Sequence, residues 1–427
     1  MKIGLINPGY KYSAVNSEVL HMGGVSYVGA SLKRAGHEVV NVDFRHDPNA
    51  SLSQVADCEM VGVSTFVNGY NFLKETLPQL KGKKVIAGGP LISSYGVGAD
   101  NLVMREFPEI DYGFIGESEL SILELVDHLK GKRQIPEGVL ARKNNEITPT
   151  VLRSRMASLD EVADVDYNDW TAFTKEVKGR DFNVLMARGC YNRCSYCFHT
   201  YNNIRSFSLP RIESQLEHIA SFKPRLISFG DEVFTFNRER ATGIAKIMKR
   251  LGIPYRISAR ATDSDPALLN MLADSGCTEI FLGVESGDQQ ILDAAGRNMQ
   301  LDDVRKAIKA SQEAHIFTGG FVLLGLPGET KETLEKTYRF IAETKVLPRA
   351  RVLIPLPGTR IYKQALAQGK ISELNFLKEC AKSENFDTVY GDWVPVNMTN
   401  GVTNQELIDA RNKINTLRLE LEKGELK

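Results

Sequence analysis

The sequence predicts an α/β protein in which strands and helices alternate in two successive series. Short runs of Val, Ile, Ala and Gly, such as "VGVSTF" and "VIAGGP", recur between segments whose apolar residues follow helical spacing. Strands with so few polar residues are typical of parallel sheets that helices cover on both faces. A chain of 427 residues is also long enough for two domains, each with its own apolar core.

The first series occupies residues 1–145. It begins with the apolar run "KIGLINP", continues with the helical pattern "GGVSYVGASLKRAGHEV", and ends with the helical pattern "SELSILELVDHLKG". This alternation predicts a doubly wound, Rossmann-like domain. Residues 146–180 are polar and lack clear periodicity, so we interpret them as an interdomain linker.

The second series occupies residues 181–365. Its expected strands are "FNVLMA", "RLISFGD", "YRISAR", "EIFLGVES", "FTGGFVLLG" and "RVLIPL". Six strand–helix units in this length predict a partial (β/α)6 barrel, smaller than the usual barrel of eight units. Residues 366–427 are expected to form a short, mostly helical C-terminal extension, whose last helix has Asn404 as a possible cap.

Composition excludes several classes of protein. Lys and Arg together number 53, as do Asp and Glu, so no basic excess indicates a nucleic-acid partner. No apolar run approaches the length of a membrane-spanning helix, and "MKIGLINPGY" lacks the features of a signal peptide. Cys58, Cys277 and Cys380 are scattered and form no disulfide framework, which predicts a reducing, cytoplasmic location.

The other three cysteines lie within eight positions, in the stretch "MARGCYNRCSYCFHT". Cys190, Cys194 and Cys197 have the spacing C-x-x-x-C-x-x-C. A zinc site would need a fourth ligand, for which His199 is a candidate, but zinc sites usually use paired cysteines. Three thiolates can instead hold three irons of a [4Fe–4S] cluster and leave the fourth iron open to a non-protein ligand. The stretch follows the first barrel strand, at the end of the barrel where such folds carry their chemistry.

This spacing, with Tyr196 as the aromatic residue before the last cysteine, resembles the signature of the radical S-adenosylmethionine (SAM) superfamily. The resemblance implies that the amino and carboxylate groups of the methionine part of SAM chelate the open iron. It also implies that reduction of the cluster cleaves SAM and yields a 5′-deoxyadenosyl radical. The electron would come from a reducing partner such as a flavodoxin or ferredoxin.

Later segments resemble further motifs of the superfamily, in the right order. They are "SFGDEVFTFN", "ISARA", "FLGVESG", "GGFVLLGLPGET" and "IPLPGTRIY". Arg260 is a candidate for the methionine carboxylate, and Glu285 is a polar residue at a strand end. The SAM-binding residues that the resemblance implies are Tyr196, Gly230, Asp231, Glu232, Arg260 and Glu285. No side chain is identified as catalytic.

The first domain resembles the cobalamin-binding domain that precedes the barrel in one branch of the superfamily. The matching segments are "GGVSYVGASLKRAGHEVVNVD", "VGVSTF", "VIAGGP" and "FIGESELSILELV". The motif D-x-H-x-x-G is absent, so we expect cobalt to be bound without a histidine ligand. No G-x-G-x-x-G follows the first strand, which disfavours a nicotinamide cofactor. The cobalamin-binding residues that the resemblance implies are Ser64, Thr65, Gly88, Gly89, Pro90 and Glu117.

The resemblance therefore implies a cobalamin-dependent radical SAM enzyme that methylates an unactivated carbon. One alternative is a radical SAM cyclase, or an enzyme that forms or rearranges C–C bonds, with or without cobalamin; another is an iron–sulfur protein without catalysis. The residues after 365 are too few for a peptide-recognition domain, which favours a small-molecule or lipid substrate. Tyr390, Asp392 and Trp393 in this tail are possible substrate contacts.

Overall fold

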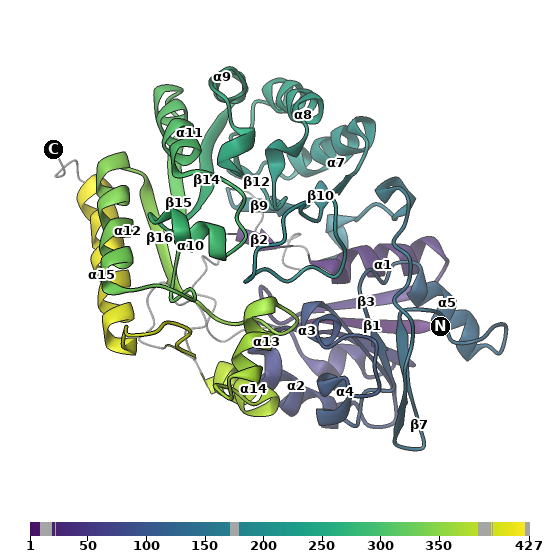
Figure 1. Ribbon diagram of the computed structural model, residues 1–427. Helices are drawn as coiled ribbons and strands as arrows, with labels where there is room; N and C mark the ends of the chain where they lie inside the picture. The colour runs from purple at the N-terminus through teal and green to yellow at the C-terminus, as the bar shows by residue number, and fades with distance from the viewer. Residues whose placement is uncertain (9–18, 22, 171–178, 383–393, 395, 423–427) are drawn as a thin grey trace. The chain divides into compact units, whose positions relative to one another are not determined.

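The structure, a computed structural model, describes residues 1–8, 19–21, 23–170, 179–382, 394 and 396–422. Its contacts divide the chain into two compact units (Figure 1). Unit 1 contains Met1–Val177 and Leu356–Glu384, and unit 2 contains Lys178–Pro355 and Asn385–Lys427. Both units are built on parallel strands, so the predicted α/β class is confirmed. Tyr390, Asp392 and Trp393 lie outside the described residues.

Unit 1 has the doubly wound fold that its sequence predicts. The sheet order is β3-β1-β4-β5-β6-β7-β8, in which the first five strands are parallel and the last two are antiparallel additions. The strand order reverses between β1 and β4, which is where open α/β sheets bind ligands. The strands of this sheet are β1 (Lys2–Asn7), β3 (Glu38–Asp43), β4 (Met60–Ser64), β5 (Lys84–Gly88), β6 (Tyr112–Phe114), β7 (Val139–Lys143) and β8 (Glu146–Thr148), and the short strand β2 (Val19–His21) is not part of it.

Two apolar clusters form the core of unit 1. Ile3 and Leu5 belong to one cluster and Ile6 to the other, because successive side chains of a strand point to opposite faces of the sheet. Both faces are therefore covered, as the apolar strand sequences predict. The helices before residue 150 are α1 (Gly24–Arg34), α2 (Tyr70–Thr76), α3 (Pro90–Ser94), α4 (Leu102–Glu106) and α5 (Ser121–Leu129).

Two late helices, α13 (Arg360–Ala367) and α14 (Glu373–Lys382), also belong to unit 1. Leu377 of α14 is fully buried in the unit 1 core, and the hydroxyls of Tyr95 and Tyr362 lie 3.2 Å apart. This grouping differs from the predicted ranges, which extended the barrel to residue 365 and treated residues 366–427 as one extension. An amphipathic pattern shows that a helix has an apolar face, but not which sheet that face covers.

The stretch interpreted as a linker also has contacts within unit 1. Arg34 of α1 donates a hydrogen bond to the carbonyl of Glu161 at 2.7 Å, and Lys33 forms an ion pair with Asp169. The Ser158 side chain caps a short turn, and Trp170 is buried. Residues 146–170 are therefore ordered by caps and tertiary contacts, neither of which leaves a periodic sequence pattern.

Unit 2 contains the predicted series of six parallel strands, in the order β16-β15-β14-β13-β12-β9. The strands are β9 (Asp181–Val184), β12 (Leu226–Phe229), β13 (Tyr255–Ala259), β14 (Cys277–Glu285), β15 (Phe317–Leu324) and β16 (Leu347–Val352). The helices are α7 (Leu209–Ser221), α8 (Arg238–Leu251), α9 (Pro266–Asp274), α10 (Gln289–Ala294), α11 (Leu301–Glu313), α12 (Lys331–Thr344) and α15 (Asn404–Glu422). Within unit 2, at least one helix follows each of the six strands, with α15 as the helix after β16, which is the (β/α)6 arrangement.

The last helix, α15, packs against the edge strand β16. The Asn415 side chain accepts a hydrogen bond from the Ala350 amide at 2.9 Å and donates to its carbonyl at 3.2 Å, so it pairs with the strand edge as another strand would. The predicted cap, Asn404, is one residue off. Thr403 accepts from the amide of Glu406, whose carboxylate accepts from the Thr403 amide.

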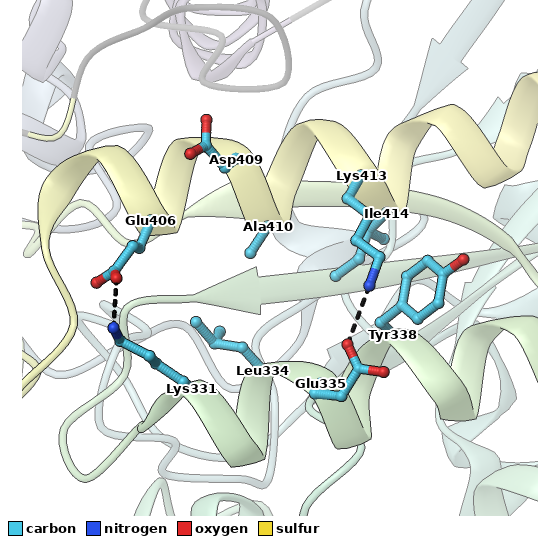
Figure 2. A pocket seen from close by; sticks show the side chains of 9 residues that line it. All are labelled: Lys331, Leu334, Glu335, Tyr338, Glu406, Asp409, Ala410, Lys413 and Ile414. Atoms are coloured by element: carbon cyan, nitrogen blue, oxygen red, sulfur yellow. Dashed lines mark hydrogen bonds and ion pairs between the residues drawn. The ribbon is translucent and has the colours of Figure 1, made fainter.

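A groove of about 200 Å³ lies between α12 and α15 (Figure 2). Ion pairs join its sides, from Lys331 to Glu406 at 2.6 Å and from Lys413 to Glu335 at 3.0 Å. None of the residues that the sequence proposes for the cofactors lines it. Within the described ranges, no helix combines the length and apolarity needed to cross a membrane.

Candidate active site

The three clustered cysteines lie in a loop that emerges at the carboxyl end of β9. Two short strands, β10 (Ala187–Arg188) and β11 (Arg205–Ser206), pair antiparallel and close the loop at its base. Gly189 starts the loop with a φ of +94°, and a Cβ there would come within 2.4 Å of the Asn203 carbonyl oxygen. Only glycine fits this position, which explains the glycine directly before the first cysteine.

The cysteine sulfurs have nitrogen donors around them. The Asn192 amide N–H donates to the Cys190 sulfur at 3.5 Å, and the Asn192 side chain lies 4.0 Å from the Cys194 sulfur. One Arg297 nitrogen lies 3.8 Å from the Cys194 sulfur. Donors of this kind stabilise thiolates and tune iron–sulfur clusters. Sequence reasoning missed Asn192, although an amide between two ligand cysteines was a visible signal.

The thiols differ in environment. Cys194 is buried, Cys190 is half-buried and Cys197 is exposed. A hydrogen bond from Cys197 and the charge of Arg297 lower the pKa of Cys194, whereas the same hydrogen bond raises the pKa of Cys197. Nowhere in the described ranges do three His, Cys, Asp or Glu side chains form a site for a single metal ion. In a [4Fe–4S] cluster each cysteine binds a different iron.

Glu285 ends β14 next to this loop, and Arg297 joins the two. An Arg297 nitrogen lies 3.5 Å from the Glu285 carboxylate and donates to the Gly283 carbonyl at 2.8 Å. A Cβ on Gly283 would meet Arg297 at 2.1 Å, so glycine in "FLGVES" leaves room for the guanidinium. Burial raises the pKa of Glu285 and Arg297 opposes this. Arg297 was not predicted, because no pattern distinguishes it from any other arginine after a helix.

Glu285 also has an unusual backbone conformation. Its φ is +63°, and the register of β14 against β15 shifts between Gly283 and Glu285. Positive φ is uncommon for residues other than glycine, and such strain concentrates at functional sites. The Tyr196 hydroxyl is buried near the charges of Glu285 and Cys194, but it makes no hydrogen bond of ordinary geometry with either.

Arg260 follows β13 and is buried. One of its terminal nitrogens donates to the carbonyls of Arg297 and Asn298, at 3.0 and 3.2 Å. Its guanidinium lies 5.0 Å from the ring centre of Tyr191. Its Nε is buried and has no partner among the described residues, and the same is true of Arg297 Nε. These two nitrogens and the Tyr196 hydroxyl are unsatisfied donors at the cysteine loop, which fits a bound polar cofactor.

The residues after β12 have intramolecular partners. Asp231 is 1% exposed, and both of its carboxylate oxygens accept hydrogen bonds from the protein. A Cβ on Gly230 would come within 2.4 Å of the Asn183 side chain, so this glycine allows β12 to pack on β9. Glu232 lies 3.4 Å from His199 and raises the pKa of that imidazole. In the structure, Gly230 and Asp231 therefore support the packing and hydrogen bonding of the barrel strands. Their contact with SAM stays a prediction.

The proposed cobalamin residues of unit 1 meet at the carboxyl ends of β4 and β5. The Thr65 hydroxyl donates to the Gly88 carbonyl at 2.8 Å and accepts from the Ile92 amide at 3.1 Å. Gly89 has a φ of +104°, and a Cβ there would lie 2.8 Å from the Thr65 backbone. The two strand ends are therefore joined closely, and Thr65 holds them from a fully buried position.

Ser64 and Pro90 lie at the same turn. The Ser64 hydroxyl is 3.0 Å from where a Gly89 Cβ would be, and Pro90 begins α3, a position that favours proline. Glu117 lies in the loop after β6 and is half-buried. Because glycine has no Cβ atom, the glycines at these strand ends let a large ligand approach the backbone, which fits cobalamin.

Comparison with known families identifies the chain. Residues 184–341 match the radical SAM superfamily, so the protein is a radical SAM enzyme with the cysteine loop near the start of that domain. Residues 13–126 match the B12 binding domain. The chain therefore belongs to the branch of the superfamily that carries a B12-binding domain ahead of the barrel. These two domains imply a [4Fe–4S] cluster, SAM and cobalamin, as the sequence predicts.

Similar proteins include two curated relatives. An uncharacterized methyltransferase of Pyrococcus horikoshii is 27% identical over 88% of this chain and 86% of its own length. An anaerobic magnesium-protoporphyrin IX monomethyl ester cyclase of Cereibacter sphaeroides is 26% identical over 84% of this chain and 63% of its own.

Two solved structures share the fold. The first is the radical SAM methyltransferase TsrM from Kitasatospora setae with cobalamin and a [4Fe–4S] cluster bound, which has a TM-score of 0.71 at 16% identity and covers 86% of this chain and 75% of its own. The second is the cobalamin-dependent radical enzyme OxsB with aqua-cobalamin and SAM bound, which has a TM-score of 0.70 at 16% identity and covers 100% of this chain and 62% of its own.

Proposed function

We propose that this protein is a cobalamin-dependent radical SAM methyltransferase that methylates an unactivated carbon of a small molecule or lipid. The observation that carries the proposal is the cysteine loop, where three thiols and three unsatisfied buried donors lie together in a chain that also has a B12-binding domain. When bound, the cluster and SAM supply an adenosyl radical and cobalamin carries the methyl group. A flavodoxin or ferredoxin is the proposed electron donor.

The side chains of unit 2 have separate roles in this proposal. Cys190, Cys194 and Cys197 bind three irons, and Arg297 stabilises the Cys194 thiolate by its charge and its N–H groups. Arg260 has an Nε free to donate to the carboxylate of SAM. In unit 1, Thr65 and Gly89 hold together the β4 and β5 ends, the part of the domain that would bind cobalamin.

The test uses the full chain, reconstituted without oxygen with iron, sulfide and cobalamin. We expect the corrin absorption to elute with the protein in gel filtration and dithionite to cause release of 5′-deoxyadenosine from SAM. With SAM carrying a deuterated methyl group, we expect label in the bound cobalamin even without a substrate. Absence of 5′-deoxyadenosine would exclude radical SAM activity, and unlabelled cobalamin would exclude the methyltransferase.

A second candidate function, ring closure, is favoured by the similarity to the Cereibacter cyclase. The mass of the product separates the two once a substrate is found. Methylation adds one CH2 to the substrate, whereas ring closure does not. A non-catalytic iron–sulfur protein would release no 5′-deoxyadenosine at all.

A further inference from the structure

A buried ion pair lies beneath the cysteine loop. Asp231, two residues after β12, and Arg240, in the first turn of α8, are joined by a hydrogen bond of 2.5 Å. Asp231 is 1% and Arg240 6% exposed. The Arg240 guanidinium also lies 5.2 Å from the ring centre of Phe236. Neither residue belongs to the loop in sequence, since Asp231 is 34 positions beyond its last cysteine.

Asp231 holds the strand that leads into the loop. Its Oδ1 accepts hydrogen bonds from the amides of Met186 and Ala187, at 2.7 and 3.0 Å. Ala187 belongs to β10, three residues before Cys190. The carboxylate thus fixes the backbone position from which the first cysteine is presented.

Arg240 holds the strand that leaves the loop. Its Nε donates to the Ser206 hydroxyl at 2.6 Å, and Ser206 is in β11, paired with Ala187. The same hydroxyl is within hydrogen-bond distance of the carbonyls of Met186 and Phe207, at 3.1 and 2.7 Å. Arg240 also donates to the Phe234 carbonyl at 3.2 Å, which fixes the guanidinium against its own helix start.

We propose that Asp231 and Arg240 are positioning residues that clamp both ends of the cysteine loop and so set the spacing of the cluster's cysteine ligands. The inference rests on the proposed function, because it assumes that the loop binds the cluster. Desolvation makes a buried ion pair a weak source of net stability, whereas its directional hydrogen bonds fix geometry well. Among the described residues, the hydrogen bonds that the Asp231 carboxylate accepts come from two amides at one end of the loop and from Arg240.

The test compares Asp231→Asn with Asp181→Asn in the full chain. Asp181 starts β9, is also buried, and accepts from Arg225 at 2.8 Å, but it lies at the opposite end of the sheet from the loop. After anaerobic reconstitution, iron is removed by a chelator and its release is followed by absorbance. We expect D231N to lose iron about tenfold faster than D181N, with an altered EPR signal of the reduced cluster, because only D231N releases the loop. Thermal unfolding reports the stability that both variants lose.

Three further variants keep the test decisive. Ser206→Ala leaves the ion pair intact but removes the contact between Arg240 and the loop's outgoing strand, so it should also lose iron faster than D181N. It takes the place of D231N in the test if D231N does not fold. Arg240→Lys retains a charge for Asp231 and should restore part of the cluster's retention relative to Arg240→Met. Equal iron loss in D231N, S206A and D181N would overturn the clamp while leaving the cluster in place. Failure of the unmodified chain to take up a cluster would instead overturn the proposed function, and the clamp with it.

Discussion

The two proposed cofactor regions differ in how their buried polar atoms are satisfied. At the β4 and β5 ends of unit 1, the hydroxyl of Thr65 both donates and accepts a hydrogen bond within the protein. At the cysteine loop of unit 2, the Tyr196 hydroxyl and the Nε atoms of Arg260 and Arg297 have no partner in the described chain. Unsatisfied buried donors are costly, so we infer that a ligand supplies the missing acceptors at the cysteine loop. At the β4 and β5 ends, Thr65 is already satisfied and can only support the backbone that a ligand contacts.

The largest effect should come from the cysteine loop itself. Cys194→Ala removes one iron ligand, and we expect it to reduce release of 5′-deoxyadenosine by about 100-fold or more. Cys277→Ala is the matched control, since Cys277 is buried in β14 and has no assigned role in the cofactor sites. Iron content and 5′-deoxyadenosine are measured in both. Equal activity of C194A and C277A would show that the loop does not bind the cluster.

Glu329 tests whether every unsatisfied buried atom marks a ligand. It is fully buried, its Oε2 accepts from the Gly325 amide at 2.5 Å, and its Oε1 has no partner among the described residues. Burial raises the pKa of Glu329 to about 8. The unfolded chain therefore loses this proton near the ordinary value of 4.5 and the folded chain only near 8, so stability falls as pH rises between them.

Glu329→Gln removes this titration. Its free energy of unfolding relative to the unmodified chain should rise by about 2–4 kcal/mol between pH 5 and pH 8.5. Denaturant unfolding at the two pH values measures this, and Glu332→Gln, in the exposed first turn of α12, is the control. A difference that does not change with pH would mean that Glu329 is ionised in the folded protein, and a missing partner would have to be sought.

Arg297 tests the electrostatic side of the comparison. Arg297→Met removes a buried positive charge near the Cys194 sulfur, which should make the cluster harder to reduce by on the order of 100 mV. Arg297→Lys retains the charge and should remain closer to the unmodified protein. The midpoint potential is measured by an EPR-monitored redox titration. If R297M has the same midpoint potential as the unmodified protein, Arg297 does not act on the cluster.

The smallest effect is expected at Thr65. Thr65→Val leaves the Ile92 amide without its acceptor and should destabilise the protein by about 1–3 kcal/mol, whereas Thr65→Ser keeps the hydroxyl. Denaturant unfolding compares the two, and the iron content should be the same in both. If T65V unfolded like T65S but lost cobalamin, Thr65 would be a ligand contact and the contrast between the two regions would fail.

The sequence predicts the fold class and the cysteine loop because both depend on local patterns. Apolar runs identify parallel strands, and the cysteine spacing is readable without any structure. Arg260 and Glu285 are predicted as site residues because they lie in segments that resemble superfamily motifs and end or follow a strand. Their roles toward SAM stay predictions, since a position at a strand end does not specify a contact.

The rest depends on contacts between distant segments. Arg297 reaches Cys194 across 103 positions, and only the folded barrel brings the two together. The resemblance of its motif to one of the superfamily implies that Asp231 binds SAM, but in the structure both of its carboxylate oxygens accept hydrogen bonds from the protein. The local sequence does not predict that α14 packs in the unit 1 core either, because its apolar face could cover any sheet.

The central claim is that the three cysteines hold a cluster whose fourth iron binds SAM. The most direct test is the EPR spectrum of the reduced, reconstituted protein before and after addition of SAM. We predict a signal typical of a [4Fe–4S]⁺ cluster that shifts on addition of SAM, in the unmodified protein and not in C194A. A reduced cluster whose spectrum is the same with and without SAM would contradict the claim.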